Sequence, residues 1–255
     1  MEKITSRQNN LIRHIRRLGT DAAYRRECGE YVCDGEKLLE EALRWGVSVK
    51  SVLWAPERKP FTALPDTARH FAVPGELLDY VSPLKSSPGV LFTAEMRSWP
   101  DAPPGRTLVL ETVQDPGNLG TILRTANALN MDAVILTGAC ADIYNPKTVR
   151  AAMGALFRQR VYRMEMHELR AWLDRHGCRL YGAALSDSAA DIRSMTLKNT
   201  AVAVGSEGSG LSDTLLALCD GTLIIPMNPA CESLNAAVAA AIIMWELDRR
   251  ENMEI

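Results

Sequence analysis

The chain has 255 residues, 47% of them hydrophobic and 24% charged, which excludes global disorder and leaves room for one large or two smaller domains. Its formal net charge is -2, so any basic surface for an acidic partner has to be local. Six cysteines without a CxxC pair, no signal segment and no apolar run of roughly 18 residues predict a cytosolic protein with reduced thiols that does not enter a membrane.

The first 26 residues predict an amphipathic helix with a basic outer face. Apolar side chains recur at helical spacing between Leu11 and Leu18. The basic residues of this segment are Lys3, Arg7, Arg13, Arg16, Arg17, Arg25 and Arg26, against Glu2 and Asp21. A solvated helix face would explain this composition, and binding of nucleic-acid phosphates is the alternative.

Residues 1–97 predict a small α/β domain. The pattern indicates strands at 30–35, 48–55, 69–73 and 89–95, with helices at 36–45 and 75–81. Residues 98–105, SWPDAPPG, contain three prolines and a glycine. This stretch interrupts every periodic pattern and is the predicted linker.

Residues 106–255 predict a second α/β domain with a cleaner alternation. Strands are expected at 107–113, 132–137, 159–164, 179–185, 200–205 and 222–227, and helices at 119–130, 146–157, 168–177, 211–219 and from Asn235 onward. Alternation at this spacing predicts a mostly parallel sheet with helices on both faces.

Three polar loops follow apolar strands of this second domain. The first, from Gln114 to Arg124, contains Asn118; the second, GSEGSGLS, runs from Gly205 to Ser212; the third leads to Asn235. Taken singly, the first loop would be explained by a surface arginine, the second by a tight turn with left-handed residues, and the third by helix capping. The glycine spacing of the second loop differs from the dinucleotide fingerprint, and the loop lacks the lysine of a P-loop.

Together these loops carry a family resemblance. Segments 111–136, 202–212 and 224–246 resemble the three motifs of the SpoU, or TrmH-type, class of RNA 2'-O-ribose methyltransferases. Residues 145–157 also resemble this family, and the opening ITSRQNNLIRHIRRL is similar to its N-terminal substrate-binding domain. The resemblance implies a C-terminal domain of the SPOUT type, whose trefoil knot holds S-adenosylmethionine. It also implies a homodimer formed through the C-terminal domain.

The resemblance assigns roles to particular residues. Arg124 would be the key catalytic residue, and the rest of the catalytic set would be Asn118, Glu207, Ser233 and Asn235. The cofactor would contact Gly205, Ile225 and Leu234. No metal is needed, because the methyl donor is already activated as a sulfonium. Since a guanidinium stays protonated in proteins, our hypothesis is that Arg124 clamps a phosphate beside the target ribose and that Glu207 holds Arg124.

Two basic stretches are predicted to bind the RNA. One is the N-terminal helix with Arg7, Arg13, Arg16 and Arg17, and the other lies between residues 143 and 164, which include Lys147 and Arg150 and no acidic residue. The N-terminal domain favours ribosomal RNA over transfer RNA as the substrate. A transfer RNA methyltransferase and a catalytically silent RNA-binding protein are the alternatives. An oxidoreductase is disfavoured by the glycine spacing and by the order of the motifs.

Overall fold

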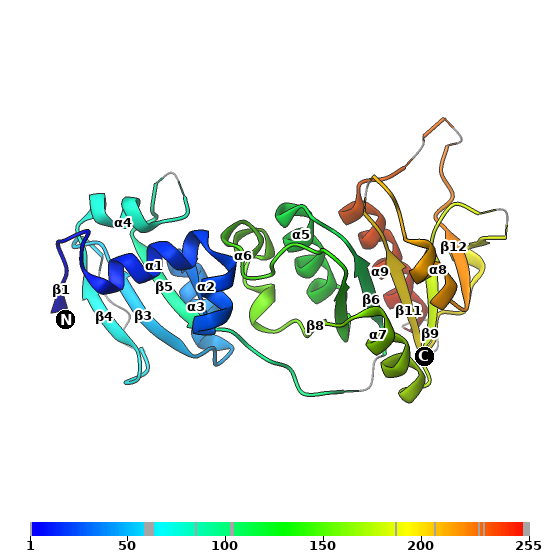
Figure 1. Ribbon diagram of the computed structural model, residues 1–255, viewed down its shortest axis with the longest axis horizontal. Coiled ribbons are helices and arrows are strands. Elements are labelled where there is room, and N and C mark those ends of the chain that lie inside the picture. The colour runs from blue at the N-terminus through cyan, green and yellow to red at the C-terminus, as the bar shows by residue number, and fades with distance from the viewer. Residues whose placement is uncertain are drawn as a thin grey trace. The chain divides into compact units, whose positions relative to one another are not determined.

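The computed structural model describes residues 2–58, 64–84, 86–102, 105–186, 188–206, 208–228, 230–231 and 233–251 (Figure 1). Contacts divide the chain into two compact units. Unit 1 comprises Met1–Ser98 and Asp142–Phe157, and unit 2 comprises Trp99–Ala141 and Arg158–Ile255. The predicted domains 1–97 and 106–255 stay a prediction; the contact division differs from them by assigning 142–157 to unit 1.

Unit 1 is built on a mixed sheet of strand order β1-β4-β3-β5-β2. The strands are β1 (Glu2–Lys3), β2 (Glu30–Asp34), β3 (Val49–Trp54), β4 (Arg69–Ala72) and β5 (Val90–Glu95). The helices are α1 (Asn10–Thr20), α2 (Ala22–Cys28), α3 (Glu36–Arg44), α4 (Gly75–Val81) and α6 (Pro146–Ala152), with a 3-10 turn at Ala155–Phe157. Strand β5 is antiparallel to both β2 and β3, whereas β4 is parallel to β1 and β3.

The single N-terminal helix that the sequence predicts is two helices, α1 and α2. Asp21 adopts an extended backbone conformation that ends α1, and its side chain then caps α2 by accepting a hydrogen bond from the Tyr24 N–H at 2.9 Å. An aspartate is a preferred residue at this position, because its carboxylate satisfies a free N–H at the helix start. The predicted apolar stripe is correct, since Ile12, Ile15 and Leu18 are buried in the core of unit 1.

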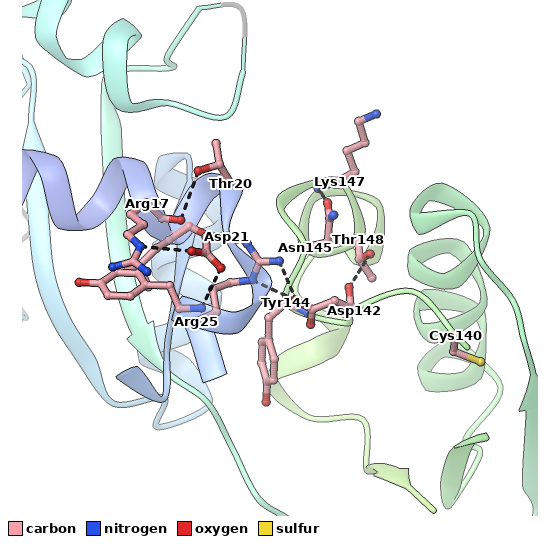
Figure 2. Close-up of polar contacts among 12 residues, drawn as sticks. Arg17, Thr20, Asp21, Arg25, Cys140, Asp142, Tyr144, Asn145, Lys147 and Thr148 are labelled. Atoms are coloured by element: carbon pink, nitrogen blue, oxygen red, sulfur yellow. Dashed lines mark hydrogen bonds and ion pairs between the residues drawn. The ribbon is translucent and has the colours of Figure 1, made fainter. Parts of the chain in front are cut away.

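The segment Asp142–Phe157 completes unit 1 through polar and aromatic contacts. Figure 2 shows the Arg25 side chain reaching from α2 to Asp142, with Nε and Nη2 donating to one carboxylate oxygen at 3.0 and 2.7 Å. The third guanidinium nitrogen donates to the Leu18 carbonyl at 2.6 Å. Tyr144 packs on Tyr31 with ring centroids 4.6 Å apart, and its hydroxyl accepts from the Arg97 N–H at 2.9 Å.

Two sequence predictions for these elements are wrong. Arg25 does not belong to the exposed basic face, because it is 2% exposed and its charge is used inside unit 1. The predicted helix 146–157 ends at Ala152, because Met153 and Gly154 both adopt positive φ angles, of 48° and 84°. The Gly154 backbone lies against α3: a Cβ there would contact Glu41 at 3.4 Å.

Unit 2 is built on a parallel sheet of strand order β10-β12-β9-β11-β6-β7-β8. Its strands are β6 (Thr107–Glu111), β7 (Ala133–Thr137), β8 (Val161–Arg163), β9 (Arg179–Ala183), β10 (Ala190–Asp191), β11 (Thr200–Val204) and β12 (Gly221–Ile224). Its helices are α5 (Pro116–Ala128), α7 (Met166–Arg175), α8 (Asp213–Leu218) and α9 (Ala236–Glu251), with a 3-10 turn at Ile192–Ser194. The predicted α/β class is confirmed for both units. The trefoil knot stays a prediction.

Helices cover both faces of the unit 2 sheet. On one face, Val109, Ile135 and Ala203 form a core with residues of α7 and α8. Because side chains alternate along a strand, the neighbouring residues point to the opposite face, where α5 and α9 contact the sheet and one another. In the part of the chain that the structure describes, no helix is long and apolar enough to cross a membrane.

Replacing Arg25 by Met tests the contact between α2 and Asp142. The variant removes both arginine donors from one Asp142 carboxylate oxygen and the arginine donor from the Leu18 carbonyl. We expect the free energy of unfolding to fall by about 2 kcal/mol, because Asp142 keeps the Tyr144 N–H and partial access to water. Urea denaturation followed by circular dichroism measures this change. Arg26→Met, an exposed neighbour on α2, is the control, with an expected change within about 0.5 kcal/mol. Equal stabilities of the two variants would contradict the structural role of Arg25.

Candidate active site

The three predicted loops all follow the carboxyl ends of strands in unit 2. The loop with Asn118 follows β6, the glycine-rich loop follows β11, and the loop leading to Asn235 follows β12. In a parallel sheet these ends share one edge, which is where α/β proteins bind ligands. The register places β11 between β6 and β9, with β12 on the far side of β9.

A pocket of about 470 Å³ lies at this edge. The ends of β9, β11 and β12, the loop from Gly205 to Leu211 and the start of α9 line it. All three predicted cofactor residues, Gly205, Ile225 and Leu234, are among the lining residues, and so is Ser233. The lining of apolar side chains and loop backbone can hold a flat, largely apolar group and hydrogen-bond its edges.

Gly205 allows the glycine-rich loop to fold back on its own start. A Cβ at Gly205 would lie 2.1 Å from the carbonyl carbon and oxygen of Gly210, far inside van der Waals contact. The turn is closed by two backbone hydrogen bonds between Ser206 and Gly210, with N···O distances of 3.2 and 3.0 Å. Gly210 has a φ of 65°, which favours glycine. The wall of the pocket therefore depends on the missing side chain at residue 205.

Glu111 fixes the other end of this loop, a role that the sequence analysis missed. It ends β6 and is only 5% exposed. Its two carboxylate oxygens accept hydrogen bonds from the Ser212 N–H at 2.7 Å and from the Ser212 hydroxyl at 2.6 Å. The Ser212 hydroxyl in turn accepts from the Leu215 N–H and caps α8. The signal available in the sequence was a glutamate at the end of an apolar strand, beside the first loop. A carboxylate that is buried at such a place needs a hydrogen-bond partner.

Two predicted catalytic residues from different loops meet. The Asn235 side-chain amide donates to the Asn118 side-chain oxygen at 3.3 Å. The Asn235 oxygen accepts from the Ala237 N–H at 2.9 Å, so this residue also occupies the start of α9 as a capping residue. Asn118 lies in the first turn of α5, whose N-cap is Asp115. The contact joins the N-terminal ends of α5 and α9.

For the remaining predicted catalytic residues the structure shows fewer contacts than for Asn118 and Asn235. Arg124 is exposed on α5, and it forms no hydrogen bond or ion pair with the residues that the structure describes. Ser233 is exposed at the pocket rim. Glu207 lies outside the described residues. The pairing of Arg124 with Glu207 therefore stays a prediction, as do the roles of all five catalytic candidates.

The six predicted RNA-binding residues are all exposed and all belong to unit 1. They are Arg7, Arg13, Arg16 and Arg17 from the N-terminal segment and Lys147 and Arg150 from α6. Arg17 is partly neutralised by Asp21, 3.2 Å away. Their role in RNA binding stays a prediction.

Arg150 also acts on a buried carboxyl group. Burial raises the pKa of Asp34 from its usual 3.8 to about 6, while hydrogen bonds from Ser82 and Ser87 and the charge of Arg150 act in the opposite direction. Ser82 and Ser87 donate through their hydroxyl groups. The positive charge of Arg150 therefore stabilises the ionised form of Asp34 within unit 1.

Comparisons with known proteins identify relatives over the full chain. The sequence profile of the SpoU rRNA Methylase family matches residues 105–245. The chain is 32% identical over 247 residues to the 23S rRNA (guanosine(2553)-2'-O)-methyltransferase RlmP of Bacillus subtilis, a match covering 97% of this chain and 99% of the relative. The AdoMet-bound rRNA methyltransferase from Sinorhizobium meliloti superimposes with a TM-score of 0.89 at 29% identity and 97% coverage of both chains.

A transfer RNA enzyme matches over a shorter length. The tRNA (guanosine(18)-2'-O)-methyltransferase of Thermus thermophilus is 37% identical over 153 residues, which are 58% of this chain and 76% of that enzyme.

Replacing Gly205 by Ala tests the folded-back loop. Because the added methyl group would overlap the Gly210 backbone, we expect the loop to open, with faster hydrogen exchange at the Ser206 and Gly210 amides and a stability loss of about 1–3 kcal/mol. Hydrogen exchange with mass spectrometry measures the opening. The control is Gly208→Ala in the same loop, where a Cβ meets nothing within 4 Å. Unchanged exchange in Gly205→Ala would refute the close approach of residues 205 and 210.

Proposed function

Since the chain belongs to the SpoU rRNA methylase family, we propose that it transfers a methyl group from S-adenosylmethionine to a ribose 2'-hydroxyl of ribosomal RNA. The observation that carries the proposal is the pocket at the carboxyl ends of β9, β11 and β12, lined by Gly205, Ile225 and Leu234. We propose the cytosol as the place of action.

The residues of the pocket fit the adenosyl part of this cofactor. Its volume of about 470 Å³ falls in the range of about 300–1,000 Å³ usual for small-molecule sites. Gly205 lets the backbone of the next loop residues form the wall directly. Ile225 and Leu234 are half-buried and would pack on the adenine ring, while backbone N–H and C=O groups would recognise its polar edge.

When bound, S-adenosylmethionine supplies a methyl group on a sulfonium, which needs no metal for activation. The protein then has to align the attacking hydroxyl with the methyl carbon and the sulfur. The polar groups that we assign to this task are Ser233, which lines the pocket, and the Asn118–Asn235 pair, in which Asn235 stands between the lining residues Leu234 and Ala236. The side-chain oxygen atoms of Asn118 and Ser233 can accept the hydrogen bond of the 2'-hydroxyl and so orient its lone pair toward the pocket.

Arg124 would act on the RNA rather than on the hydroxyl proton. A guanidinium stays protonated in proteins, so it is a poor general base. Its planar fork suits bidentate binding of a phosphate, and its side chain is exposed on α5, the helix that carries Asn118. Arg124 would hold the phosphate beside the target ribose and thereby fix the ribose in front of the pocket.

Ribosomal RNA is favoured over transfer RNA by the extent of the similarity. The ribosomal RNA relative matches along the whole chain, whereas the transfer RNA relative matches 58% of it. The part outside the transfer RNA match would then contribute to recognition of ribosomal RNA.

Methyl transfer from tritiated S-adenosylmethionine tests the function. The purified protein is incubated separately with in vitro transcribed 23S rRNA, 16S rRNA and bulk tRNA, and the labelled nucleoside is identified by mass spectrometry. We expect 2'-O-methylation of ribosomal RNA and calorimetric binding of S-adenosylmethionine that Gly205→Ala weakens. Label in tRNA alone would favour the transfer RNA alternative, and binding of RNA without cofactor binding would favour a silent RNA-binding protein.

Replacing Arg124 by Lys tests the phosphate clamp. Lysine keeps the charge but cannot make two parallel hydrogen bonds, so we expect kcat/KM for RNA to fall by about 10- to 100-fold, with cofactor binding unchanged. The control is Arg175→Lys, an exposed arginine on α7. Steady-state kinetics measure both variants, and normal turnover by Arg124→Lys would exclude the bidentate clamp.

A homodimer through α9 is part of the proposal. Val238 and Trp245 are 48% and 56% exposed, and with half-buried Ile242 they recur at helical spacing on one side of α9. An apolar stripe of this kind is typical of an interface. It lies on the helix whose start contributes Asn235 and part of the pocket, so a second subunit there would cover the region beside the site.

Replacing Trp245 by Glu tests this interface. Placing a charge in an apolar contact should shift the protein from dimer to monomer, because the buried carboxylate would lack a partner. Light scattering after size-exclusion chromatography measures the mass. Met153→Glu, at another exposed apolar residue (59%) that lies in unit 1, should leave the dimer intact. A monomeric wild-type protein would exclude the dimer.

A further inference from the structure

Two arginines of unit 1 share one aromatic ring. The Cζ atoms of Arg7 and Arg16 lie 4.5 and 3.9 Å from the centroid of the Tyr80 ring. The two guanidinium carbons are therefore no farther apart than the sum of these distances. Like charges at this separation repel one another, and the ring quadrupole compensates only part of that cost.

Neither arginine has an acidic partner in the part of the chain that the structure describes. The contrast with neighbouring Arg17 is direct, because that residue pairs with Asp21 and also lies over an aromatic ring, Tyr24. Asp79, adjacent to Tyr80 in the chain, accepts a hydrogen bond from the Ser87 N–H at 2.7 Å instead. Arg7 and Arg16 thus bring two charges without an acidic partner to one aromatic ring.

The elements that carry the three residues are held firmly. Arg7 lies in a turn in which the Ser6 hydroxyl accepts from the Gln8 N–H at 3.1 Å and the Ser6 carbonyl from the Asn9 N–H at 3.2 Å. Helix α1, with Arg16, packs on α4, with Tyr80, through their buried apolar residues. The backbone at Arg7 and Arg16 is therefore fixed, and the contacts with the Tyr80 ring orient the two guanidinium groups, which reduces the entropy cost of binding.

We propose that Arg7 and Arg16, stacked on Tyr80, form a binding site for the phosphodiester backbone of the RNA substrate, with Tyr80 as the positioning residue. The site deepens the proposed function and rests on it. A guanidinium stacked on an aromatic ring keeps its N–H groups free at the ring edge for phosphate oxygens. A phosphate bound by both arginines at the edge of the ring would also offset their repulsion.

The test is the salt dependence of RNA binding by the full chain. The probe is a fluorescein-labelled RNA hairpin, and anisotropy gives Kd from 50 to 300 mM KCl. Because each neutralised phosphate contributes about 0.7–0.9 to the slope of log K against log salt, we expect the double variant Arg7→Gln/Arg16→Gln to lower the slope by about 1.4–1.8 and to weaken binding at least tenfold.

Matched variants separate the site from general loss of charge. Arg69→Gln/Arg179→Gln removes two other exposed arginines that lie over aromatic rings, at 5.0 Å from Phe71 and 5.7 Å from Tyr181, and should retain most of the wild-type slope. Tyr80→Leu should weaken binding several-fold with Tyr80→Phe restoring it, because Phe keeps the ring. Equal slopes for the two double variants, or equal affinities of Tyr80→Leu and the wild type, would overturn the proposal.

Methyl transfer distinguishes this proposal from the proposed function. If the wild-type protein methylates ribosomal RNA, Arg7→Gln/Arg16→Gln should raise KM for RNA and leave cofactor binding unchanged. An unchanged KM in an active enzyme would overturn the site while the function stands. A wild-type protein that binds RNA through these arginines but never methylates would instead overturn the function.

Discussion

Parallel pairing of the unit 2 strands is the constraint on which the site depends. It brings the carboxyl ends of β6, β11 and β12 to one edge although their loops are distant in sequence. After each strand end the chain forms a loop, and the backbone N–H and C=O groups of this loop can contact a ligand. Gly205 and Glu111 turn this general property into a defined pocket, because one allows the loop to fold back and the other ties its far end to β6.

Several polar side chains of unit 2 stabilise the loops and helix starts around the pocket. Glu111 and Ser212 satisfy one another and cap α8, so both are used for the framework. The side-chain oxygen of Asn235 caps α9, while its amide group donates to Asn118. Because a capping side chain is held in a fixed orientation, capping of α9 by Asn235 is compatible with the role at the substrate that we propose for it.

The sequence predicted most strands and helices, because apolar periodicity is a local property and the alternation of the two element types specifies a parallel sheet. It also predicted the lining of the pocket at Gly205, Ile225 and Leu234, through the resemblance of the motifs. It could not predict that Arg25 is buried or that Glu111 binds Ser212, since both depend on partners about a hundred residues away. An arginine is usually exposed, so its residue type alone predicts a surface position. Arg25 is buried because it pairs with Asp142, which is distant in the sequence.

The return of residues 142–157 to unit 1 has a consequence for the order of events during synthesis. Domains generally fold as units as the chain emerges from the ribosome, but unit 1 lacks the partner of Arg25 and the Tyr144 ring until β6, α5 and β7 have also been made. The N-terminal part of unit 1 therefore lacks these contacts while the first two of the seven strands of the parallel sheet are synthesised. Unit 1 would therefore be completed only after part of unit 2 has been synthesised, and a fragment ending at the linker would expose the surface that α6 and Tyr144 cover.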